Sequence, residues 1–122
     1  KGAIASSVAH DSHNIVVIGC SDEEMARAAN MIIKSKGGLV AWSYDQHKCI
    51  PLPIAGLMTN QNGYKIAGDY LLLVALAKEF GSTLNDPFMT MGFMSLLVIP
   101  KLKLSDKGLF DCEKFQLTEL FE

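Results

Sequence analysis

IVVIGCSDEEMARAANMIIKSKGG, residues 15–38, contains a strand, a complete helix and the signal that ends this helix. Residues 15–18 are β-branched throughout, which is typical of a buried strand. Ser21 stands three residues before Glu24, the spacing of a capping box, and therefore predicts the start of a helix. Gly37 and Gly38 follow the last helical turn and predict where it stops.

The helix predicted over residues 21–36 has one apolar stripe. Its apolar residues recur at the i, i+3, i+4, i+7, i+8 spacing of a helix that buries one face: Met25, Ala28, Ala29, Ile32 and Ile33. Lys34 and Lys36 lie at its carboxyl end, where positive charge complements the helix dipole.

Strand patterns surround this unit on both sides. Residues 3–9 are small and predict a short strand, and residues 39–42 and 49–52 predict a third and a fourth, with residues 45–48 forming the turn between them. Pro51 and Pro53 lack a backbone N–H and restrict the fourth strand to a sheet edge or to a short pairing.

A second helix is predicted over residues 64–80, ending at Gly81. Its interior, residues 71–77, is apolar on nearly every side. A surface helix would carry a polar face, so we expect this helix to be covered on two faces or to pack on a partner domain.

The remainder of the chain gives weaker patterns. Residues 85–110 predict an apolar, irregular tail with a turn at 106–108, and residues 114–120 predict a final strand. The expected fold class is α/β (α+β): a single domain over residues 1–122 with a mixed four- to five-stranded sheet and two main helices.

Composition excludes several classes of protein. The net charge of −2 comes without a basic stripe, so nucleic acid is not an expected partner. The longest apolar region, residues 88–99, is interrupted by polar residues and glycine, so no membrane span is expected. Three widely spaced cysteines without a C-x-x-C pair argue against a disulfide framework and fit a reducing cytoplasm. Because Lys1 leads almost directly into a strand, we expect a piece of a longer polypeptide.

The densest polar chemistry lies between the first two strands, in the cluster His10-Asp11-Ser12-His13-Asn14, residues 10–14. Imidazoles beside a carboxylate suit a divalent metal or proton transfer. On an extended strand positions 10 and 13 would face opposite sides, whereas on a turn they can converge. The structural alternative is that these side chains satisfy backbone groups at a strand end.

A metal site contained wholly in this chain is not expected. Such a site needs three or four protein ligands, and beyond the cluster only His47, the cysteines and scattered carboxylates remain. The nucleobase-deaminase zinc signature, G-x-S-x-G, the P-loop and G-x-G-x-x-G are absent.

Two further segments have a functional and a structural interpretation. Residues 51–58 could line a pocket or contact another domain, although a rigid connector is the favoured interpretation. Met89, Met91 and Met94 could form an adaptable contact surface, although core filling is favoured.

Several blocks together resemble the carboxyl-terminal domain of bacterial adenine deaminases, in the amidohydrolase superfamily. The resemblance is carried by residues 2–14, ending in the His10–Asn14 cluster, by Leu52-Pro53-Ile54-Ala55-Gly56-Leu57-Met58, by residues 86–90 and by residues 98–111. The helix over residues 21–36 and its glycine pair also fit. The blocks occur in the family's order over nearly the whole chain.

This resemblance implies more than the spacing of residues does. Such enzymes hydrolyse adenine to hypoxanthine and ammonia, with a binuclear manganese or iron centre that activates water. The metal ligands belong to a (β/α)₈ barrel domain of about 250 residues, which this chain is too short to contain. The barrel domain of the same chain is therefore an expected partner, adenine is the expected substrate of the whole enzyme, and a homo-oligomer is expected.

The leading hypothesis is an adenine deaminase domain that binds no metal and is inactive alone. His10, Asp11, His13 and Asn14 would support the barrel's active site, either by facing it or by holding the interface that shapes it. The alternatives are a purely structural interface or oligomerisation module and, last, a small metal-binding domain.

Overall fold

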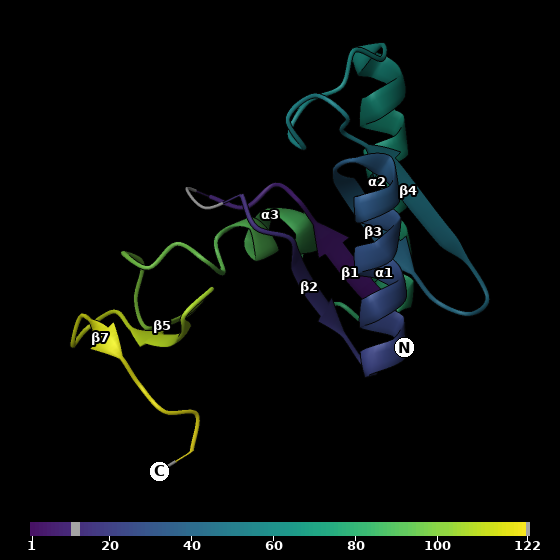
Figure 1. The fold of residues 1–122 in the computed structure, drawn as a ribbon. Helices are drawn as coiled ribbons and strands as arrows, with labels where there is room; N and C mark the ends of the chain where they lie inside the picture. The colour runs from purple at the N-terminus through teal and green to yellow at the C-terminus, as the bar shows by residue number, and fades with distance from the viewer. Residues whose placement is uncertain (11–12, 122) are drawn as a thin grey trace.

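The computed structural model describes residues 1–10 and 13–121, so Asp11 and Ser12 lie outside the described residues. Figure 1 shows the elements in their arrangement. In chain order they are β1 (Ala3–Ser6), β2 (Val16–Gly19), α1 (Asp22–Ser35), β3 (Gly38–Trp42), β4 (His47–Pro51), α2 (Gly63–Glu79), α3 (Pro87–Gly92), β5 (Leu102–Ser105), β6 (Gly108–Asp111) and β7 (Gln116–Leu117).

The main sheet has four strands in the order β2-β1-β3-β4. Each neighbouring pair is antiparallel, so β2 and β3 run in the same direction on either side of β1 and are connected through α1. The expected α+β class, with a four-stranded sheet and two main helices, is confirmed. The antiparallel pairing places the fold on the α+β side of the expectation, and β4 is an edge strand, as its prolines predict.

One face of the main sheet packs on α1. Because side chains alternate along a strand, every second residue of β1 and β3 points to this face. The buried members of this cluster are Ala3, Ala5, Ala28, Ile32 and Val40. Small side chains on β1 let α1 lie close to the sheet.

The other face of the main sheet packs on α2 and α3, which gives three layers with the sheet in the middle. Its buried residues are Ala41, Ile50, Leu52, Leu73, Ala77, Phe88 and Met91. This face carries the larger side chains.

The ends of α1 follow the sequence pattern closely. The Ser21 hydroxyl accepts the N–H of Glu24 at 3.3 Å and donates to its carboxylate at 3.1 Å. At the other end Lys36 is left-handed, with φ 59°, and Gly37 after it also has a positive φ of 119°. Gly37 is required for another reason: a Cβ there would lie 2.3 Å from the Cα of Gly56.

The outer surface of α2 does not match a helix covered on two faces by this chain. Tyr64 is 92 % exposed, Leu71 71 % and Leu72 58 %, although Leu73 and Ala77 are fully buried beneath them. The expectation of two covered faces within the described chain is therefore wrong, and contact with a partner domain is the part of it that remains.

The tail is more regular than expected. Residues 87–92 form the short helix α3, for which Asp86 is the N-cap and Pro87 the first residue. The strands β5, β6 and β7 form a second, three-stranded antiparallel sheet. In Figure 1 this small sheet projects away from the main layers.

Some predicted boundaries are wrong. The first strand ends at Ser6 rather than residue 9, the fourth begins at His47 rather than residue 49, and the last is confined to residues 116–117. The turn before β4 lies earlier than expected because the N–H and hydroxyl of Ser43 both bond the carbonyl of Gln46. Within the described residues no helix combines the length and apolar composition needed to cross a bilayer.

Candidate functional site

The polar cluster lies in the loop of residues 7–15, which joins β1 to β2 at one end of the main sheet. The side chain of Ala9 is buried, whereas His10, His13 and Asn14 are exposed. The N–H of His10 donates to the carbonyl of Gly92 at 2.8 Å, so the loop is attached to the end of α3. His13 has a φ of 51°, a left-handed conformation that produces a sharp change of direction.

His10 and His13 line the same cavity, of about 630 Å³. The two histidines therefore border one cavity, which side chains on opposite faces of an extended strand would not do. The other lining residues come from β1, the start of β3, α2 and the α3 region: Ser6, Val8, Ala9, Leu39, Tyr70, Phe88, Met89, Gly92 and Phe93. Asn14 is not among the lining residues, and Asp11 lies outside the described residues.

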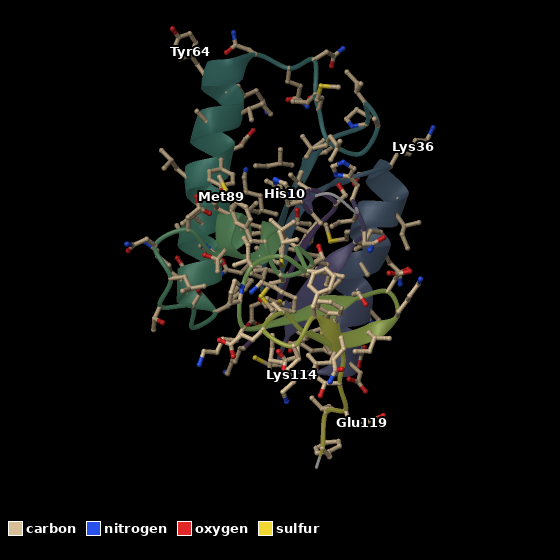
Figure 2. All side chains as sticks on the ribbon, turned by 90° about the vertical axis from the view of Figure 1, so that its left-hand side faces the viewer. His10, Lys36, Tyr64, Met89, Lys114 and Glu119 are labelled. Atoms are coloured by element: carbon tan, nitrogen blue, oxygen red, sulfur yellow. The ribbon has the colours of Figure 1, made fainter. Side chains whose placement is uncertain are left out.

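Aromatic rings form much of the cavity wall. The His10 ring stacks on Phe93, with centroids 5.7 Å apart and planes 24° apart. Tyr70 and Phe88 form a second ring pair, with centroids 6.2 Å apart. Figure 2, which faces this side of the molecule, shows His10 and Met89 near one another at the centre of the view. A planar or apolar group fits such a wall, with the two imidazoles as polar contacts.

Other polar groups of the wall are used within the chain. The Tyr70 hydroxyl donates to the Asp86 carboxylate at 2.5 Å, and the same carboxylate accepts the N–H of Met89. Burial, with Asp86 as a further cause, holds the pKa of Tyr70 well above its usual range, so the phenol stays protonated. The Ser6 hydroxyl bonds the backbone of Val8. The imidazoles of His10 and His13 are the other polar side chains that line this wall.

The donor set does not fit a metal centre. Among residues 1–10 and 13–121, no three His, Cys, Asp or Glu side chains are close enough to hold an ion. Cys20, Cys49 and Cys112 are free thiols on separate elements, and burial raises the pKa of Cys49. A binuclear manganese or iron site cannot be built from the described residues.

Several wall residues were not singled out from the sequence. Tyr70, Phe88 and Phe93 lie at least 56 positions after the cluster, and a helical pattern alone does not distinguish a cavity wall from a core. A usable signal was the Asp86-Pro87 pair, which marks the start of a helix next to an aromatic residue. The methionines are divided: Met91 is buried as core, whereas Met89 is 60 % exposed at the cavity.

A second loop lies close to the start of the cluster loop. Residues 52–58 follow β4, and the carbonyl of Gly56 accepts the hydroxyl of Ser7. This loop has left-handed conformations at Ala55 and Gly56, and its side chains Ile54 and Met58 are 45 % and 55 % exposed. It connects β4 to α2 and also offers apolar side chains at the surface.

The family model and the relatives that match this chain carry the same description, adenine deaminase. Residues 1–116 match the family model described as the adenine deaminase C-terminal domain. The chain is 50% identical over 121 residues to an adenine deaminase of Methanosarcina acetivorans, covering 99% of this chain and 22% of that protein. It is 53% identical over 120 residues to an adenine deaminase of Sulfurovum sp., covering 98% and 22%.

A third relative shows the same extent. An adenine deaminase of Borreliella burgdorferi is 50% identical over 116 residues, which is 94% of this chain and 21% of that protein. The chain thus spans about a fifth of the length of the relatives that it matches. Because the family model covers nearly every residue described above, the chain belongs to the family of adenine deaminase C-terminal domains.

Proposed function

We propose that this chain is the C-terminal domain of a metal-dependent adenine deaminase, which converts adenine and water to hypoxanthine and ammonia. The cluster of residues 10–14 then supports an active site formed by a barrel domain of the same protein. The observation that carries this proposal is the convergence of two exposed histidines, His10 and His13, on one surface cavity. Family membership supplies the reaction.

The domain is proposed to be inactive by itself. Within the described residues, no group of side chains is suited to hold a metal ion. The manganese or iron implied by the family would therefore be held outside this chain. The relatives are four to five times longer than the matched region, which leaves ample length for a barrel of about 250 residues.

The two imidazoles have a defined chemical capacity at such a boundary. Neutral imidazole has one nitrogen that donates and one that accepts, so each histidine can orient a polar edge of a substrate or of a neighbouring loop. The apolar wall behind them, including Phe93 and Met89, would exclude water from that contact. This chain's contribution is positioning and shielding.

A second candidate is a purely structural module for interdomain contact or oligomerisation. It is favoured by the outer surface of α2, where Tyr64, Leu71 and Leu72 are exposed. The β5–β7 sheet adds further exposed apolar side chains, among them Leu102, Leu104 and Leu117. Exposed apolar side chains on each of these two elements are typical of surfaces that another domain or subunit covers.

The histidines can be tested in the full-length protein. We expect His10→Ala and His13→Ala to lower kcat/KM for adenine by about tenfold or more, because a misplaced substrate contact is costly to rate. His47→Ala is the matched control, since His47 is exposed at the start of β4 and is not a wall residue of the cavity. Its kinetics should equal those of the wild type.

The same variants separate the two candidate functions. Unchanged kinetics in both His10→Ala and His13→Ala, with lower thermal stability or altered assembly, would support the structural module and overturn the site-supporting role. Adenine turnover by the isolated 122-residue chain with added manganese would overturn the claim that it is inactive alone.

A further inference from the structure

We propose that Ser7 is a positioning residue that holds the cluster loop, residues 7–15, and the connector loop, residues 52–58, as one unit beside the active site. This inference rests on the proposed function and adds to it a residue outside the His10–Asn14 cluster. It also adds a second loop to the surface that faces the barrel domain.

The Ser7 hydroxyl makes two hydrogen bonds with different parts of the chain. It accepts the N–H of Gly38 at 2.9 Å and donates to the carbonyl of Gly56 at 2.5 Å. Its own backbone N–H donates to the carbonyl of Gly38 at 3.0 Å. The Ser7 side chain is buried, with 7 % of its surface exposed, so a lost bond would not be replaced freely by bulk water.

Close backbone packing supports the same junction. A Cβ on Gly37 would lie 2.3 Å from the Cα of Gly56 and 2.8 Å from the carbonyl oxygen of Leu52. The N–H of Leu52 also donates to the carbonyl of Gly37 at 2.9 Å. The connector loop therefore lies directly against the end of α1, and Ser7 lies on the other side of the same contact.

The connector loop is closed by its own hydrogen bonds, so its residues should move together with Gly56. Ile54 and Met58 pair with each other through two backbone hydrogen bonds of 3.1 Å, which closes the loop on itself. Their side chains remain exposed. Fixing Gly56 thereby fixes two apolar side chains at the surface.

The first part of the cluster loop is held at two points. Ser7 fixes its beginning, and three residues later the N–H of His10 donates to Gly92. Because Val8 and Ala9 are the only residues between these anchors, moving Ser7 should move the imidazole of His10. A rearrangement of about 1 Å at a substrate contact is enough to reduce turnover strongly.

The opposite end of β3 offers a matched control. Ser43 is also buried, at 8 % exposure, and its hydroxyl also makes two hydrogen bonds, here with the N–H and carbonyl of Gln46. It stabilises the turn before β4, far along the strand from the cluster loop. Ser7→Ala and Ser43→Ala remove the same hydroxyl from comparable surroundings.

The experiment uses the full-length protein with adenine as the substrate. We expect Ser7→Ala to lower kcat/KM by about tenfold, and Ser43→Ala to leave kcat and KM unchanged even if both melt at a lower temperature. Hydrogen exchange should rise at residues 7–10 and 53–58 in Ser7→Ala, and only at residues 43–47 in Ser43→Ala. Gly56→Ala, strained by its φ of +73°, perturbs the junction from the other side and should reproduce the Ser7→Ala kinetics.

Each outcome decides the proposal. Equal kinetics in Ser7→Ala and Ser43→Ala, or faster exchange in only one of the two loops, would overturn the positioning role. If Ser7→Ala does not fold, Gly56→Ala with wild-type kinetics would overturn it instead. A wild-type protein without adenine turnover would contradict the proposed function itself, and the exchange pattern would then decide the coupling of the two loops.

Discussion

The two main helices cover opposite faces of one sheet, yet their outer surfaces differ. On α1 the outer surface is polar: Arg27 pairs with Glu23 at 2.9 Å and lies 5.6 Å from the ring centre of Trp42, and Ile33 is a single exposed apolar side chain. On α2 the outer surface carries Tyr64, Leu71 and Leu72. The inner surfaces are alike in having fully buried residues at their centres, Ala28 and Ile32 on α1 and Leu73 and Ala77 on α2.

The inner surface of each helix holds it in the fold, whereas the outer surface has to suit whatever surrounds it. The inner stripe of each helix is enough to hold it on the sheet, because burial of that stripe supplies most of its stability. The outer stripe is free to match its surroundings. The polar outer surface of α1 is suited to contact with water, whereas the apolar outer surface of α2 is suited to contact with another domain or subunit.

The largest expected effects test whether the inner surfaces are equivalent. Ile32→Ala on α1 and Leu73→Ala on α2 each remove a fully buried side chain, at 1 % and 0 % exposure. Both should lower the unfolding free energy by about 2–5 kcal/mol, since each leaves a cavity. Urea titration of the 122-residue chain measures this. A loss below about 1 kcal/mol in only one variant would mean that the two faces are not equally important.

Removing the N-caps of the two helices should lower the unfolding free energy by less than the core substitutions do. Ser21→Ala and Asn62→Ala remove the N-caps of α1 and α2, and each should cost about 0.5–2 kcal/mol. Each cap makes two hydrogen bonds, but those of Ser21 are partly buried and those of Asn62 are exposed, so the loss should be greater for Ser21. Thermal unfolding of the two variants gives the order directly. A greater loss in Asn62→Ala would contradict it.

Acid should weaken the contact of α2 with β4 in a defined pH range. Lys48 on β4, and then Lys65, lower the pKa of Asp69 from 3.8 to about 2. Because the folded pKa is the lower one, the stabilisation is present above pH 3.8 and is lost as the pH falls through 2. Melting temperatures of Asp69→Asn and wild type should therefore converge toward pH 2. A constant difference between pH 5 and 2 would exclude this linkage.

The smallest effect on stability is expected at the outer surfaces. Leu71→Ser on α2 and Ile33→Ser on α1 change side chains that are 71 % and 62 % exposed, so unfolding of the 122-residue chain should change by less than about 0.5 kcal/mol in each. In the full-length protein, Leu71→Ser should alter association or thermal stability, and Ile33→Ser should not. Identical behaviour of the two variants there would remove the proposed contact at α2.

The elements with strong local signals were predicted well. Residues 15–38 carry β-branched residues, a capping box and an apolar stripe, and the structure has β2 and α1 there. Two details were wrong: β2 is an edge strand with Ile18 47 % exposed rather than a buried strand, and Ile33 of the stripe is 62 % exposed. The tail was predicted poorly because its strands contain only two to four residues and each pair of strands is joined by few residue pairs. Short strands lack the length that makes an alternating pattern recognisable.

The candidate site was predicted in part. Dense polar chemistry identified the loop of residues 10–14, and the structure directs His10 and His13 to one cavity. The supporting role of these residues stays a prediction. Phe93 and Tyr70 could not be found as wall residues, because their meeting with His10 depends on how α2 and α3 pack on the sheet.

The sequence by itself determined the strand–helix unit, the edge position of β4 and the family to which the chain belongs, because these depend on local patterns and residue identities. The tertiary structure decided that the two histidines converge, that Ser7 joins two loops, and that the outer surface of α2 is exposed. These features arise from contacts between residues far apart in the chain. No local spacing encodes such contacts, since each depends on the packing of all three layers.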